Sequence, residues 1–116
     1  MIENGYIHEE RGVKLVFVVP ETAPETVYCR AEIGSTEGLD LDGVTREMLS
    51  ANLFWRGANG ATLGLHEDVA YLTDRRERAY FGPNDEELAE YEQQMVLTVL
   101  SWRERLENHR LSEEVR

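Results

Sequence analysis

The first third of the chain alternates apolar and polar residues with the period of two that is typical of β-strands. This pattern predicts strands over Gly5–Glu9, Lys14–Val19 and Thr26–Gly34. The apolar face of the third strand consists of Val27, Cys29, Ala31 and Ile33. Because successive side chains of a strand point to opposite faces, these four are expected to lie inside, and the third strand to be half-buried.

The second predicted strand is apolar on both faces. Leu15, Phe17 and Val19 share one face, and Val16 and Val18 lie on the other. Such a strand either lies in the centre of a sheet or presents an apolar face to a partner. If it lies at an edge, it could also accept a partner segment by strand addition.

The middle of the chain predicts a helix followed by a hairpin. Asp42 is expected to be the N-cap of the helix, and Gly57 the glycine that ends it. The apolar residues at helical spacing are Val44, Met48, Leu49, Leu53 and Phe54, with Trp55 close behind. Two strands are then expected over Ala61–His66 and Val69–Asp74, joined by a turn at Glu67 and Asp68, and residues 75–80 extend the hairpin.

The strongest helical pattern lies near the C-terminus. Pro83 and Asn84 mark its start, and Glu87 follows Asn84 at the spacing of a capping box. The apolar stripe consists of Leu88, Tyr91, Met95, Val99, Trp102 and Leu106. Steps of three and four residues place this stripe on one face, which is expected to lie along a sheet. The order β-β-β-α-β-β-α predicts an α+β fold in which helices pack on an antiparallel β-sheet.

The length of the chain indicates the number of domains, and its charge limits the kinds of partner that it can bind. A chain of 116 residues predicts one domain over residues 1–110, with a polar tail over residues 111–116. Twelve basic and 23 acidic residues give a formal net charge of −11. This charge excludes nucleic acid and anionic membranes as favoured partners. It serves solubility alone, or it keeps a carrier with apolar surface from self-associating, or it attracts a basic partner segment.

The reactive residue types do not form a catalytic pattern. Cys29 is the only cysteine, which fits a reducing cytosol, and a mid-strand thiol is expected to be a core residue. His8, His66 and His109 have no metal-ligand spacing. The glycines between positions 57 and 64 follow a helix rather than precede one, so they do not predict a phosphate loop. The sequence therefore predicts no enzyme, no metal and no cofactor. No apolar run is long enough to span a membrane, and the first residues are not those of a signal peptide.

Large apolar residues are clustered near the end of the predicted middle helix. Leu53, Phe54 and Trp55 are adjacent there, and a glycine-rich segment follows. They are interpreted either as ordinary core or as a homodimer interface, because exposed aromatic clusters mark association sites.

These residues carry a family resemblance. The run Leu49-Ser50-Ala51-Asn52-Leu53-Phe54-Trp55-Arg56-Gly57, followed by Gly60-Ala61-Thr62-Leu63-Gly64-Leu65, resembles the hallmark of the Tir chaperone family. Members of that family are class I chaperones of bacterial type III secretion. The strand around residues 69–72 and a long terminal helix with a tryptophan, here Trp102, are also similar to the family pattern, and the resemblance covers roughly residues 5–107.

The resemblance implies an α/β sandwich that forms a homodimer in the bacterial cytoplasm. The implied dimer interface consists of Leu49, Leu53, Phe54, Trp55, Leu63 and Leu65. The family binds the N-terminal segment of a type III effector protein in extended form, without catalysis, and keeps it stable and competent for export. The effector-binding residues implied here are Val16, Val18 and Tyr28.

The sequence differs from the family pattern in one respect, and a second function is also compatible with it. The family pattern begins with an amphipathic helix before its first strand, whereas this sequence starts almost directly in a strand at Gly5. The usual N-terminal helix is therefore expected to be absent here, or to lie outside this sequence. The alternative function is a regulatory or adaptor domain of the same fold that binds a folded protein partner.

Overall fold

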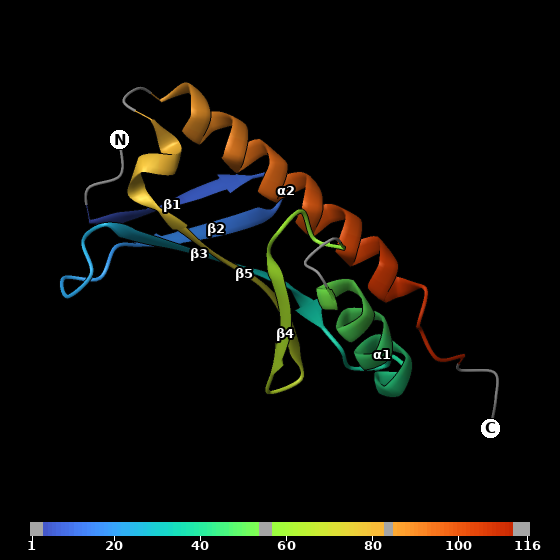
Figure 1. Ribbon diagram of the computed structural model, residues 1–116. Coiled ribbons are helices and arrows are strands. Elements are labelled where there is room, and N and C mark those ends of the chain that lie inside the picture. The colour runs from blue at the N-terminus through green and yellow to red at the C-terminus, as the bar shows by residue number, and fades with distance from the viewer. Residues whose placement is uncertain (1–3, 54–56, 83–84, 113–116) are drawn as a thin grey trace.

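A computed structural model describes residues 4–53, 57–82 and 85–112. Within these residues, five strands form one antiparallel sheet in the order β1-β2-β3-β5-β4 (Figure 1). The strands are β1 (Gly5–Glu10), β2 (Val13–Val18), β3 (Thr26–Ser35), β4 (Thr62–His66) and β5 (Val69–Glu77). The helical elements are α1 (Leu41–Asn52), the 3₁₀ helix η2 (Arg78–Phe81) and α2 (Glu86–Glu107). The α+β prediction is confirmed, and every strand ends within three residues of its predicted bounds.

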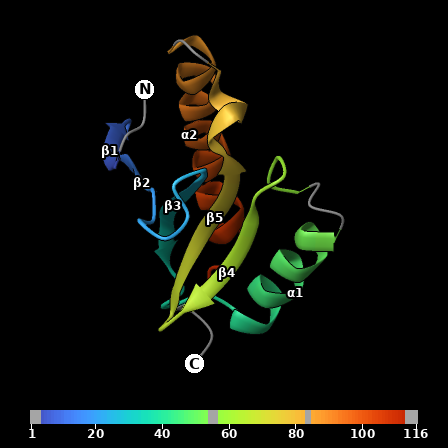
Figure 2. The same ribbon diagram turned by 60° about the vertical axis from the view of Figure 1, so that its left-hand side comes forward.

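The sheet has one covered face and one open face. Burial alternates along β2 and β3, as the period of two requires. The covered face, here called the helix side, includes Leu15, Phe17, Cys29, Ala31 and Leu72. Helix α2 runs along this side over β2 and β3, and α1 packs beside β4 (Figures 1 and 2). The opposite face, here called the outer face, has no helix of the described residues packed on it.

The apolar stripe of α2 is buried as predicted. Leu88, Tyr91, Met95, Val99, Trp102 and Leu106 are all core residues. The indole Nε1 of Trp102 donates a hydrogen bond to the carbonyl of Gly57 at 3.0 Å, so the ring is buried with its polar atom satisfied. Arg103 donates to the carbonyls of Ile33 at 2.7 Å and Gly12 at 3.0 Å. These bonds fix α2 to the ends of the first strands.

Helix α1 begins two residues earlier than predicted. Asp40 is its N-cap residue, and the Asp40 carbonyl accepts the Val44 amide at 2.9 Å. Asp42 lies instead in the first turn, where its carboxylate accepts a hydrogen bond from Arg46 at 3.0 Å. The prediction of Asp42 as N-cap was wrong because both aspartates suit a helix start, and the sequence does not rank them.

The predicted role of Gly57 also needs correction. The helix ends at Asn52, and Leu53 is its C-cap residue. Gly57 remains tied to the helix, because its amide donates to the carbonyl of Ala51 at 3.0 Å. A side chain at position 57 would lie 2.3 Å from the Ala51 Cβ. Glycine is therefore required for close approach to α1, not for ending the helix in a left-handed conformation.

The remaining boundaries follow the sequence closely. Glu67 and Asp68 form the predicted turn between β4 and β5, with φ values of 48° and 66°. Positive φ at both central residues is the pattern of a type I′ hairpin turn. Helix α2 starts at Glu86 with Asp85 at the cap position, and the predicted start at Pro83 and Asn84 lies outside the described residues. In the predicted tail, the Leu111 amide donates to the Gly38 carbonyl at 2.9 Å.

Candidate functional site

The outer face carries an apolar hollow where β2, β3 and β5 meet. Val16, Val18 and Tyr28, the three predicted effector-binding residues, all line it. Strand register brings them together, because Val18 pairs with Tyr28 and Val16 pairs with Arg30. The hollow has a volume of about 340 Å³. That is near the lower end of ligand-binding cavities, about 300 Å³, and it suits one or two side chains of a larger partner.

The hollow continues across the sheet in two further depressions. The second lies between Tyr28, Thr62, Thr73 and Arg75, and the third between Arg30, Gly64, His66, Tyr71 and Thr73. Adjacent depressions share Tyr28, Arg30 or Thr73. On the other side, Ile7 of β1 pairs with Val16 and is 60% exposed. The outer face is therefore apolar around Ile7, Val16 and Val18, with the paired charges of Glu9 and Lys14 farther along β1 and β2, and it becomes more polar toward β4.

Two arginines stand at the centre of this face. Arg75 lies opposite Tyr28 in the β3–β5 pairing, and Arg30 lies two residues beyond Tyr28 on β3. Among the residues that the structure describes, neither guanidinium forms an ion pair. The guanidinium of Arg30 lies 6.0 Å from the ring centroid of Tyr71, at the limit of a cation–π contact.

The predicted dimer residues divide into three groups. Leu49 and Leu53 of the α1 segment are 65% and 64% exposed, and Leu65 of β4 is also exposed. Leu63 is only 4% exposed and belongs to the core of the chain itself, so its side chain offers no surface to a partner. Phe54 and Trp55 lie outside the described residues. The surface formed by Leu49, Leu53 and Leu65 is here called the α1–β4 edge.

A hydrogen-bonded pair fixes this edge. The side-chain amide of Asn52 donates to the Leu63 carbonyl and accepts from the Leu63 amide, both at 2.8 Å. Asn52 thus bonds β4 as the backbone of a neighbouring strand would. It attaches the end of α1 to the outermost strand of the sheet (Figure 2).

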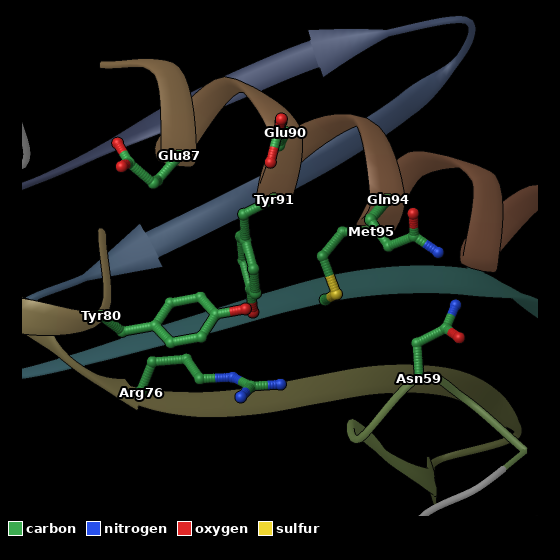
Figure 3. Close-up of a pocket in the computed structure, with 8 residues that line it drawn as sticks. All are labelled: Asn59, Arg76, Tyr80, Glu87, Glu90, Tyr91, Gln94 and Met95. Carbon is green, nitrogen blue, oxygen red and sulfur yellow. The ribbon is translucent and has the colours of Figure 1, made fainter. Parts of the chain in front are cut away.

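A polar hollow of about 400 Å³ lies on the helix side, between β5, η2 and α2 (Figure 3). Arg76 lies in it with its guanidinium 4.7 Å from the Tyr80 ring centroid. Arg76 Nε also donates to Asp74 at 3.0 Å, and the Tyr91 hydroxyl donates to the same carboxylate at 2.5 Å. Burial lowers the pKa of Arg76, but the hydrogen bond to Asp74 and the attraction of its negative charge together outweigh burial and leave the pKa raised. This arginine is therefore held within its own chain.

The remaining chemistry-bearing residues do not converge. Cys29 is buried, as predicted. Burial and the nearby Asp74 carboxylate raise the pKa of the Cys29 thiol to about 12. Within residues 4–53, 57–82 and 85–112, no group of three His, Cys, Asp or Glu residues is arranged to hold a metal ion. The helices found there are also too short or too polar to cross a membrane.

The sequence analysis did not assign Ile7, Arg30, Arg75 and Thr73 to the binding site, although strand alternation already places Arg30 on the same face as Tyr28. The alternation of β1 and β3 places Ile7 and Arg30 opposite buried neighbours, which is a signal available in the sequence. Arg75 carries no such signal, because it reaches Tyr28 only through the pairing of β3 with β5.

The five-stranded antiparallel sheet with a long helix along one face is a fold that this chain shares with chains of solved chaperone–effector complexes of type III secretion. The fold implied by the resemblance is thus confirmed. No family model matches the sequence, and no curated protein matches it.

Three solved structures are similar to this chain. A chain of the ExsC–ExsE complex has a TM-score of 0.68 and 17% identity, over 88% of this chain and 74% of its own length. A chain of the HopA1–SchA chaperone–effector complex has a TM-score of 0.61 and 13% identity, over 88% and 77%. A chain of the heterodimeric ExoU–SpcU complex from the type III secretion system of Pseudomonas aeruginosa has a TM-score of 0.59 and 18% identity, over 90% and 81%.

Proposed function

We propose that this protein is a non-enzymatic chaperone of type III secretion in the bacterial cytoplasm. It binds the N-terminal segment of one effector protein in extended form on its outer face, and it keeps that effector competent for export. The observation that carries the proposal is the gathering of Val16, Val18 and Tyr28 in one hollow of an open sheet face. The fold it shares with chains of secretion complexes supports a role in binding.

The geometry suits an extended segment better than a compact ligand. The depressions of the outer face share lining residues and follow one another from β2 to β4. An extended chain advances about 3.3 Å per residue, so a few residues can place successive side chains in successive depressions. Burial of apolar surface stabilises a complex by about 25 cal/mol per Å². A segment that covers Ile7, Val18 and Tyr28 together would therefore bind more tightly than one that covers a single residue.

The proposed homodimer uses the α1–β4 edge. Leu49 and Leu53 are exposed on the same element that Asn52 attaches to β4. Exposed leucines of this kind are typical of the apolar centre of a protein interface. Because Asn52 already bonds the Leu63 backbone, the two copies would meet through side chains there rather than by pairing the β4 strands at that point.

A pull-down followed by limited proteolysis tests the proposed function. Tagged protein is recovered from the bacterium that encodes it, under conditions that induce secretion, and the complex is trimmed with protease and weighed. The expected result is two copies of this chain and one partner that is protected only over a segment near its N-terminus. Val18→Asp should lose the partner, whereas Leu97→Asp, an equally drastic change on exposed α2 surface, should retain it.

Two results would argue against the chaperone. A partner protected along its whole folded length would favour the adaptor function, because a folded protein would then be the ligand. Equal recovery of the partner by the Val18→Asp variant and the unchanged protein would move the binding site away from the outer face.

A further inference from the structure

We infer that the segment bound on the outer face carries an acidic side chain two positions from its apolar anchor, and that Arg30 and Arg75 bind this carboxylate. The inference rests on the proposed function and specifies its ligand. It runs against the net charge of −11, which by itself favours a basic partner.

Arg30 and Arg75 differ from most of the other described arginines in their bonding within the chain. Most other described arginines are engaged by their own chain: Arg46 by Asp42, Arg76 by Asp74, Arg105 by Glu47 and Arg110 by Glu107. Arg103 donates to three backbone carbonyls. Arg30 and Arg75 have no such partner among the described residues, although the chain has an excess of carboxylates.

The position of the two arginines also supports the inference. Tyr28 forms part of the apolar hollow, and the two arginines flank it, one across the β3–β5 pairing and one along β3. Residues two apart on a strand are separated by about 6.6 Å, and adjacent strands by about 4.8 Å. An extended segment with an apolar side chain over Val18 and Tyr28 therefore places the side chain two positions away beside a guanidinium. A guanidinium binds a carboxylate through paired hydrogen bonds.

The charge near the hollow differs in sign from the net charge of the whole chain. Glu32 and Glu77 share the outer face and lie two residues beyond Arg30 and Arg75, but they form no ion pair with them in the described part of the chain. At physiological ionic strength the screening length is about 8 Å, so carboxylates elsewhere on the chain are largely screened from this site. Asp74 also lines the hollow, but its carboxylate is bonded to Arg76 and Tyr91. Glu32 and Glu77 lie farther from Tyr28 than Arg30 and Arg75 do, so, among the described residues, the unpaired charges nearest the apolar anchor are positive.

The test uses three labelled nine-residue peptides that share one apolar anchor. They differ only in the residues two positions before and two positions after the anchor, which are both aspartate, both glutamine or both lysine. Dissociation constants are measured by fluorescence anisotropy at low and high salt. Aspartate should bind about tenfold more tightly than lysine, with glutamine between them, and the difference should shrink in high salt.

Variants locate the preference. Arg30→Gln with Arg75→Gln should remove the difference between the three peptides and leave the glutamine peptide unchanged. Arg11→Gln, which makes the same kind of change in the exposed β1–β2 turn, should leave the preference intact. Val18→Asp should weaken all three peptides, because it places a charge in the apolar hollow.

Three outcomes would overturn the inference. Equal binding of the three peptides, with loss in the Val18→Asp variant, would leave the outer face as the binding site but deny it the acidic preference. Tighter binding of the lysine peptide would assign control to the overall charge. Failure of all three peptides to bind would also overturn the inference, and the pull-down would then decide the proposed function separately.

Discussion

Asn52 completes the hydrogen bonding of Leu63, with one bond donated to its carbonyl and one accepted from its amide, each 2.8 Å long. A buried or half-buried backbone group that loses its partner costs about 1–3 kcal/mol. The contact also joins α1 to the strand beside it. The side chain of one residue therefore holds the element that carries the proposed dimer surface in place.

Asn52→Ala is expected to lower the free energy of unfolding by about 2 kcal/mol, because both Leu63 backbone groups lose their partner. Asn52→Asp keeps the acceptor and loses the donor, so its loss should be smaller. Urea denaturation measures the free energies, and hydrogen exchange at the Leu63 amide reports the site directly. Unchanged exchange at Leu63 in the alanine variant would show that the contact does not protect β4.

Leu53→Asp is expected to convert the proposed homodimer into folded monomers. Leu53 is exposed in the single chain, so the substitution spares the core, but in the dimer it would bury an unpaired charge. The dimer should weaken by about 100-fold or more. Light scattering coupled to size-exclusion chromatography measures the mass, with Leu97→Asp as the control on another surface. A Leu53→Asp protein that keeps the mass of a dimer would rule out this part of the α1–β4 edge.

Glu47→Gln should make the free energy of unfolding depend less on pH in the acid range. Arg105 Nε donates to Glu47 at 2.7 Å, and His109 Nε2 lies 2.6 Å from its carboxylate. Burial raises the pKa of Glu47, but the hydrogen bonds from His109 and Arg105 outweigh burial and leave the pKa below its ordinary value of 4.5.

A carboxyl group whose pKa is lowered by folding stabilises the protein above its unfolded pKa. That stabilisation is lost as the pH falls through the folded pKa. The glutamine variant should therefore be less stable by about 1 kcal/mol at pH 7, and the gap should close below about pH 4. Glu104→Gln, on exposed α2 surface, is the control. A gap that stays constant down to acid pH would assign the loss to packing rather than to charge.

The thiol of Cys29 is expected to be unreactive in the folded protein. It is 3% exposed, and its pKa is raised to about 12. At pH 8 only about one molecule in ten thousand would carry the thiolate, which is the reactive form. A disulfide reagent that releases a coloured thiol should react slowly in buffer and rapidly in urea. The Cys29 side chain faces the core, so rapid reaction in buffer would mean that β3 separates readily from the rest of the fold.

Substitutions in the β4–β5 turn are expected to stabilise the protein. Glu67 and Asp68 both have positive φ, a conformation that asparagine and glycine adopt at lower cost. Glu67→Asn together with Asp68→Gly should raise the free energy of unfolding by about 0.5–1 kcal/mol. Glu67→Ile, which places a β-branched residue at positive φ, should lower it. Thermal denaturation measures both, and a neutral double variant would mean that the native pair already fits the turn.

Local periodicity was enough to predict most of the fold. Leu88 to Leu106 step along one face of α2, and Val27 to Ile33 alternate along β3, so each element follows from short stretches of sequence. The outer face was predicted only in part. Val16, Val18 and Tyr28 came from the family resemblance, whereas Arg75 joins them through the pairing of β3 with β5. Tyr28 and Arg75 lie 47 positions apart in the sequence, and no local pattern contains a pairing of that separation.

The proposed dimer residues show that local spacing does not determine burial. Helical spacing grouped Leu49 and Leu53 with Val44 and Met48, but only the last two are buried. Leu63 was assigned to the same interface, yet the strand alternation places it on the helix side, within the core. The depth of a residue depends on which element covers it, and α1 covers only part of β4.

The bonds of Arg103 have a consequence for the order in which the chain can fold during synthesis. Its guanidinium reaches carbonyls 70 and 91 residues earlier in the sequence, at Ile33 and Gly12. All five described strands leave the ribosome before α2 does, so their apolar inner side stays uncovered until α2 has been made. Stable folding is therefore delayed until nearly the whole described chain is available. Each nascent copy is therefore expected to expose the kind of apolar surface that promotes aggregation until its last helix has been made.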